Sequence, residues 1–321
     1  MKLKVILPCA LLVASPALAA PYAFTPLPAG FTATALNNLG QVAGQAPVVQ
    51  LADGSVVVGP ALYSNRTVTP LAVGPNAPAA RVAGINDAGD LVLVGTSGAR
   101  SSLFAVFGGV VSGFAVPEAQ PGVASVASLN SERQIVGSTL VFATDGTATT
   151  QGYVSFGGAY TLLAVPGAGT TRPARINDAG QVVGAYTNSQ QINPQGFLYD
   201  AGTFTTIDVP GAASTMLNGI NDAGEVSGIY TDTTGAQHGF TEAGGVFSDV
   251  TGPDGAAFLG SSVNNQGQLI GAFAGGGLSY LATPVAAAVP EPGSAALLGG
   301  VLALGAAVRR RDKPGHSGHA A

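Results

Sequence analysis

The chain has 321 residues, of which only 9% are charged, and its formal net charge is −5. Residues 20–292 hold six arginines, no lysine and sixteen carboxylates, a balance of −10 that disfavours binding to nucleic acid or to anionic lipid. The 47 glycines and 21 prolines interrupt short β-branched runs, which excludes a mainly helical protein and predicts an all-β fold.

The N-terminus has the three parts of a cleavable signal peptide. Two lysines precede an apolar run that ends in an Ala-x-Ala sequence. This sequence predicts cleavage between Ala19 and Ala20, so we expect residues 1–19 to be removed. The only cysteine, Cys9, lies inside this leader, and the mature body therefore has neither a disulfide nor a thiolate metal site.

Residues 20–284 contain six copies of one short unit, for example INDAGQVVG, which begins at Ile176. The asparagine that all copies share stands at Asn37, Asn86, Asn130, Asn177, Asn221 and Asn264. Each step is between 43 and 49 residues long. This period matches the roughly 40–50 residues of a four-stranded propeller blade.

Each complete copy predicts four antiparallel strands. The unit itself gives the end of the first strand, a turn in which Asn and Asp bond their own backbone, and an apolar second strand. An aromatic segment, such as the one that begins at Gly196, predicts the third strand. A polar segment, such as the one that begins at Phe204, predicts the fourth strand at the outer edge of the blade.

The two ends of the repeat region complement each other. The last copy stops after its third strand, and residues 22–27 resemble a fourth strand. We therefore expect a six-bladed β-propeller of four-stranded antiparallel blades, with the ring closed by the N-terminal strand. The alternative is an open array with a ragged N-terminal start.

The repeat region, over residues 27–282, resembles the HAF-type extracellular repeat proteins. Their His-Ala-Phe triplet opens the third strand and survives here as His238-Gly239-Phe240, whereas two other copies read Gln195-Gly196-Phe197 and Gln151-Gly152-Tyr153. The resemblance implies an exported repeat protein without an established enzymatic activity. Because the histidine is not shared between the copies, it gives no support to a histidine-based site.

The C-terminus resembles the PEP-CTERM sorting signal. A predicted linker, residues 285–294, contains Pro290, Glu291 and Pro292. A short apolar segment and an arginine stop follow in residues 295–311, and residues 312–321 form a predicted cytoplasmic tail. The stop consists of Arg309, Arg310 and Arg311.

The apolar part of this tail is short for a permanent membrane span. Residues 295–308 give about 21 Å of helix against a hydrocarbon core of about 30 Å. The resemblance implies transient membrane insertion and cleavage near the Pro-Glu-Pro motif by an exosortase-type transpeptidase. A plain C-terminal anchor is the alternative.

The body offers few groups for catalysis, and we expect no catalytic, cofactor-binding or metal-binding residue. His238 is its only histidine and has no nucleophile motif around it. Asp87, Asp178 and Asp222 follow the repeat asparagine and could suit calcium, but other copies place Asn or Ser there. Turn formation explains these carboxylates without a metal.

The second and third strands are expected to be joined by variable loops at residues 45–60, 138–151 and 231–237. These loops carry Asp53, Asp145 and Asp232, and we expect any ligand on their face of the propeller.

The sequence therefore predicts an exported protein of the cell envelope or extracellular matrix with a non-catalytic structural or interaction role. Its expected partners are signal peptidase, the exosortase-type transpeptidase and, from this setting, exopolysaccharide. A glycan-binding module is the first alternative, and it would need aromatic side chains at its binding face. A propeller glycosidase or lyase is the second, and it would need two carboxylates that face each other across a substrate.

Overall fold

The computed structural model describes residues 22–285, except 51, 53, 55, 74–79, 98–99, 117–123 and 189–192. The predicted leader, with Ala19 and Ala20, and the predicted tail from residue 286 onward lie outside the described residues. That tail includes Pro290, Glu291, Pro292 and the three arginines at 309–311. In the described part of the chain the regular elements are β-strands, and it has no helix long and apolar enough to cross a membrane.

The strands form six blades of four. Blade 1 is β2 (Thr32–Leu36), β3 (Val42–Gln50), β4 (Val56–Ser64) and β5 (Thr67–Pro70), and blade 2 is β6 (Arg81–Ile85), β7 (Leu91–Ser97), β8 (Arg100–Phe107) and β9 (Val110–Phe114). Blade 3 is β10 (Ser125–Leu129), β11 (Ile135–Phe142), β12 (Ala148–Phe156) and β13 (Ala159–Leu163), and blade 4 is β14 (Ala168–Ile176), β15 (Val182–Asn188), β16 (Gln195–Asp200) and β17 (Thr203–Thr206). Blade 5 is β18 (Ser214–Ile220), β19 (Val226–Thr231), β20 (Gln237–Ala243) and β21 (Val246–Val250), and blade 6 is β22 (Phe258–Val263), β23 (Leu269–Phe273), β24 (Tyr280–Pro284) and β1 (Tyr22–Pro26).

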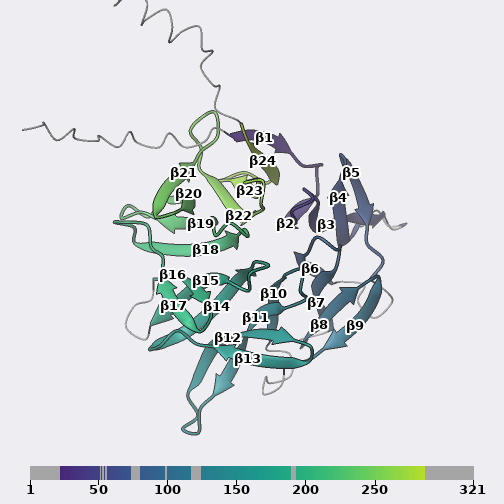
Figure 1. Ribbon diagram of the computed structural model, residues 1–321. Coiled ribbons are helices and arrows are strands. Elements are labelled where there is room, and N and C mark those ends of the chain that lie inside the picture. The colour runs from purple at the N-terminus through teal and green to yellow at the C-terminus, as the bar shows by residue number, and fades with distance from the viewer. Residues whose placement is uncertain are drawn as a thin grey trace, which may run out of the picture. The chain divides into compact units, whose positions relative to one another are not determined.

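Within each blade the four strands pair antiparallel in the predicted order. Blades 3 and 4 share one eight-stranded sheet because β12 and β14 meet in a single parallel pair, Thr150 with Thr170. The first strands of successive blades contact each other around a closed circle, from β2 through β6, β10, β14 and β18 to β22 and back to β2 (Figure 1). The protein is therefore an all-β propeller, as the sequence predicted.

The hydrophobic core consists of six clusters, each between two neighbouring blades. A second strand such as β7 contributes side chains to two clusters, one on each side of its blade. In β7, Leu91 and Leu93 belong to the cluster shared with blade 1, whereas Val92 belongs to the cluster shared with blade 3. This placement explains why consecutive residues of the repeat are apolar, because both faces of the second strand are buried.

The predicted closure by the N-terminal strand is confirmed. β1 pairs antiparallel with β24 as the outermost strand of blade 6, and Tyr22 lies opposite Pro284. The Phe24 ring lies 5.0 Å from the rings of both Phe258 and Phe273. Leu27, just after the strand, is buried in the cluster between blades 6 and 1.

Two of the three expected variable loops are largely strand, whereas residues 232–236 form the expected loop between β19 and β20. Residues 45–50 extend β3, residues 56–60 extend β4, and only residues 143–147 separate β11 from β12. The physical reason is that these segments are rich in Val, Thr and Ala, which continue the hairpin ladder past the propeller body.

Candidate functional site

The six repeat asparagines form a closed circle of hydrogen bonds at the centre of the propeller. Each donates from its side-chain Nδ2 to the backbone carbonyl of the matching asparagine in the next blade. The links are Asn37 to Asn86 (3.1 Å), Asn86 to Asn130 (3.1 Å), Asn130 to Asn177 (3.0 Å), Asn177 to Asn221 (3.0 Å), Asn221 to Asn264 (3.1 Å) and Asn264 to Asn37 (3.1 Å). All six side chains are buried, and we call this set the asparagine ring.

Each asparagine also holds its own turn. The Oδ1 of Asn37 accepts from the backbone N–H of Leu39, two residues on, at 3.1 Å, and from that of Gln41 at 2.9 Å. Its Nδ2 donates to the Gln41 side chain at 2.8 Å. One amide therefore fixes a turn and joins two blades, which any other turn-forming residue could do only in part.

The residue after the repeat asparagine behaves differently from the expected turn residue in five of the six copies. In these five its side-chain oxygen accepts from the backbone N–H of the matching residue in the preceding blade. The donor and acceptor pairs are Asn38 with Asp87 (2.7 Å), Ser131 with Asp178 (2.8 Å), Asp178 with Asp222 (2.8 Å), Asp222 with Asn265 (2.9 Å) and Asn265 with Asn38 (2.8 Å). Carboxylate and amide oxygens both accept a hydrogen bond, which explains why Asp and Asn share this position.

Arg175 lines a central hollow of about 60 Å³ together with residues of the asparagine ring. Its guanidinium donates to the carbonyl oxygens of Thr34 on β2 (2.6 Å) and Ala127 on β10 (3.2 Å), so the side chain crosses the centre and joins blades 1, 3 and 4. Burial lowers the pKa of Arg175 to about 10, so it stays charged at neutral pH. The remaining volume suits a few ordered waters.

The asparagine ring and the turns between third and fourth strands lie on one face of the propeller, which we call the turn face. The hairpin ends between second and third strands lie on the opposite face, which we call the loop face.

On the loop face, Asp232 accepts from Thr234 and lies 2.9 Å from His238, and these bonds lower the pKa of Asp232. Asp145 accepts in the same way from its own turn, and Asp53 lies outside the described residues. Across the described part of the chain, no three His, Cys, Asp or Glu side chains are grouped to hold a metal.

Blade 3 departs from the repeat at one turn position. Five copies place a glycine there, with φ between 68° and 81°: Gly40, Gly89, Gly180, Gly224 and Gly267. The third copy places Arg133 there, and its φ is 62°. Side chains are strained in this region by roughly 1–2 kcal/mol, and such strain is characteristic of functional positions.

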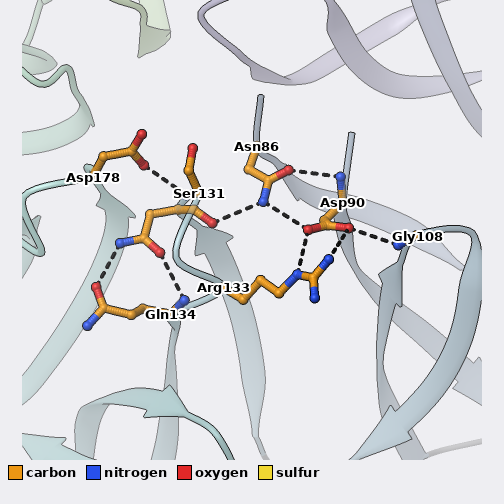
Figure 2. Close-up of polar contacts among 8 residues, drawn as sticks. Asn86, Asp90, Gly108, Ser131, Arg133, Gln134 and Asp178 are labelled. Carbon is orange, nitrogen blue, oxygen red and sulfur yellow. Dashed lines mark hydrogen bonds and ion pairs between the residues drawn. The ribbon is translucent and has the colours of Figure 1, made fainter. Parts of the chain in front are cut away.

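A second departure lies directly opposite the first. Asp90 occupies a position where the other copies have Gln or Glu, and it is only 2% exposed. Arg133 donates to it through Nε (2.8 Å) and Nη2 (3.4 Å), and Asp90 also accepts from the backbone of Gly108 and from Asn86 (Figure 2). The guanidinium lies 4.8 Å from the centre of the Phe107 ring. The two departures thus form one ion pair between blades 2 and 3.

This ion pair should give the stability a dependence on pH. Burial raises the pKa of Asp90, but hydrogen bonds from Arg133, Gly108 and Asn86 outweigh it and hold the pKa below its usual value. Such a carboxyl adds stability above its unfolded pKa of about 4 and loses it as the pH falls through the folded value. We expect the wild type to be more stable than Asp90→Asn at pH 7, and the difference to shrink below about pH 4. Urea denaturation from pH 7 to pH 3 measures it, and a difference that stays constant would contradict the ion pair.

A pocket of about 390 Å³ opens beside this ion pair, between blades 2 and 3 on the turn face. We call it the inter-blade pocket. Blade 2 contributes two phenylalanines, and blade 3 contributes a phenylalanine, a tyrosine and the two charged residues of its first turn. These six are Phe107, Phe114, Glu132, Arg133, Phe156 and Tyr160. The pocket lies on the face opposite to the one on which we expected a ligand.

Sequence reasoning missed both the asparagine ring and the inter-blade pocket. A signal for the ring was available, because all six copies keep Asn where a turn would also accept Asp, Ser or Gly. A signal for the pocket was the single copy with Arg133 in place of glycine. The pairing of Arg133 with Asp90 was hidden, because it joins two different copies of the repeat.

No protein-family profile matches the chain, and no curated protein matches it. Among solved structures, virginiamycin B lyase from Staphylococcus aureus is similar over 83% of this chain and 100% of its own, with 10% identity and a TM-score of 0.41. TolB from Acinetobacter baumannii is similar over 81% and 65%, with 10% identity and a TM-score of 0.48. The Aleuria aurantia lectin, described as a six-bladed propeller that recognises fucose, is similar over 72% and 78%, with 12% identity and a TM-score of 0.38. At these values the similarities carry no conclusion about ligand or activity, and the β-propeller assignment rests on the strand pairing described above.

Proposed function

We propose that the protein is an exported, non-catalytic interaction propeller of the cell envelope or extracellular matrix, sorted by its C-terminal signal. The leader at residues 1–19 and the tripartite tail at residues 285–311 support export and sorting. The acidic, lysine-free body fits a role outside the cell that involves neither nucleic acid nor anionic lipid.

The observation that carries this proposal is how closely the propeller fits between the two processing segments. β1 begins at Tyr22, three residues after Ala19, and β24 ends at Pro284, six residues before Pro290. Both strands belong to blade 6 and pair with each other. Cleavage at either predicted point would therefore leave all 24 strands of the propeller intact.

The polar groups at the centre support a structural rather than a catalytic use of this region. The asparagine ring, the acceptors that follow it and Arg175 all bond to backbone groups of neighbouring blades. The hydrogen-bonding capacity of these groups is used to hold neighbouring blades together. The result is a rigid body whose outer surfaces are available for binding.

The intact mass of the mature protein from its native cells tests the proposal. We expect a species that begins at Ala20, ends near Pro292 and carries additional mass from covalent attachment at the cell surface. A species that starts at Met1, or one that retains residues 309–321, would contradict the proposed processing.

A further inference from the structure

We propose that the inter-blade pocket binds a neutral saccharide through one pyranose ring. This inference rests on the proposed function only for the setting, since exopolysaccharide is the partner expected outside the cell. The ligand class itself is argued from the pocket.

Phe156 is the aromatic side chain of the pocket that is best placed for stacking on a ligand. Phe156 is the last residue of β12, next to the turn that leads into β13, and its side chain lines the pocket and is 56% exposed. Phe107, Phe114 and Tyr160 are half-buried around the same space. The C–H groups on one face of a pyranose ring carry partial positive charge and pack against the negative face of an aromatic ring.

The polar side chains provide the groups that sugar hydroxyls require. The exposed carboxylate of Glu132 accepts hydrogen bonds, and the guanidinium of Arg133 donates them. Two of the five guanidinium N–H donors are used on Asp90, which leaves three for a ligand. A volume of about 390 Å³ lies within the range of small-molecule pockets.

The balance of charge favours a neutral ligand over an acidic one. The positive charge of Arg133 is already matched by Asp90 at 2.8 Å. Glu132 then leaves the pocket with one unmatched negative charge, which repels a uronic acid or another anion. A neutral hexose or deoxyhexose meets both the aromatic rings and the polar groups without this penalty.

The strained backbone of Arg133 agrees with a binding role, because strained non-glycine residues are concentrated at ligand sites. Glycine would remove this strain, and five copies have glycine there. The arginine places a charged guanidinium along one wall of the pocket. This group lies over the Phe107 ring and is held by the nearly buried carboxylate of Asp90. Both side chains that create this wall are departures from the repeat, so the pocket is a feature added to the propeller rather than a by-product of it.

The first experiment measures binding of neutral methyl pyranosides (glucose, galactose, mannose and fucose series) and of methyl glucuronide to the full chain by saturation-transfer NMR and titration. We expect at least one neutral glycoside to bind, and Phe156→Ala to weaken it by about tenfold or more. Phe142→Ala is the matched control, because Phe142 is 50% exposed in the same blade but lies at the loop-face end of β11. The Phe142→Ala variant is expected to bind the glycoside with the wild-type affinity.

A second variant separates binding from folding. Asp90→Gln combined with Arg133→Gly restores the repeat at both positions, so we expect a chain that melts at or above the wild-type temperature but binds at least tenfold more weakly. Binding of none of the neutral glycosides, a preference for the glucuronide, or binding unchanged in both variants would each overturn the proposal. None of these results bears on the intact mass, so the proposed export could still stand or fall separately.

Discussion

A variant that lacks residues 22–28 is expected to melt at least 10 °C below the full chain, an effect of about 5 kcal/mol. β1 is the outer strand of blade 6, so the deletion removes the whole ladder with β24. It also removes the Phe24 ring from Phe258 and Phe273 and takes Leu27 out of the cluster between blades 6 and 1. Each kcal/mol lost lowers the melting temperature by about 2–4 °C in a chain of this size.

Phe24→Ala tests the same contact without shortening the chain. Because Phe24 is half-buried, we expect Phe24→Ala to lower the free energy of unfolding by about 2 kcal/mol. Phe142 is half-exposed, so Phe142→Ala should lower it by less than about 1 kcal/mol. Scanning calorimetry of the three variants and the wild type measures these differences. A deletion variant with an unchanged melting temperature would mean that β1 does not close the ring in solution.

Asn177→Ala is expected to destabilise the propeller by about 3 kcal/mol, which corresponds to roughly 6–12 °C. The change removes the donor to the Asn221 carbonyl (3.0 Å) and the acceptor for the Gln181 N–H (2.9 Å), and it leaves buried polar groups without partners. Asn218 is the matched control, because it also bonds to a neighbouring blade but makes one longer bond, 3.3 Å to the Gly260 carbonyl. We expect Asn218→Ala to cost about 1 kcal/mol or less.

Asn177→Asp separates the donor from the acceptor in the same side chain. An ionised carboxylate keeps the bond from the Gln181 N–H but cannot donate to the Asn221 carbonyl, so we expect a large loss at pH 7. At pH values below about 4 the carboxyl is protonated and can donate again, so part of the loss should be recovered. Urea denaturation at both pH values measures the change in the free energy of unfolding. If Asn177→Asp and Asn218→Ala lowered it equally at pH 7, the result would contradict the asparagine ring.

The repeat asparagine shows how far sequence alone can go. Its spacing predicted the blades, and the resemblance of residues 22–27 to a fourth strand predicted the closing strand, because both are local patterns within a known period. The acceptor of each Asn side chain lies in the next blade, and its position depends on how the blades pack. No local pattern encodes that distance, so the ring could be described only from the structure.

The site was harder to predict than the fold for a related reason. Any ligand was expected on the loop face, beside the segments predicted as variable loops, yet residues 45–50 and 56–60 extend the paired strands β3 and β4. The inter-blade pocket depends instead on two single residues, Asp90 and Arg133, in different copies. Each looks like an ordinary repeat variation until the two side chains are seen to meet.

The pairing of β1 with β24 also sets the order in which the propeller can assemble. β1 is synthesised first, but its partner is the last strand of the ring, so it must wait while all the other blades form. Contacts between residues so distant in the chain form slowly. Until they form, the edge of β24 stays open to strands from other molecules. Refolding should therefore be slow and its yield should fall as the protein concentration rises, because the two ends of one chain compete with the ends of its neighbours.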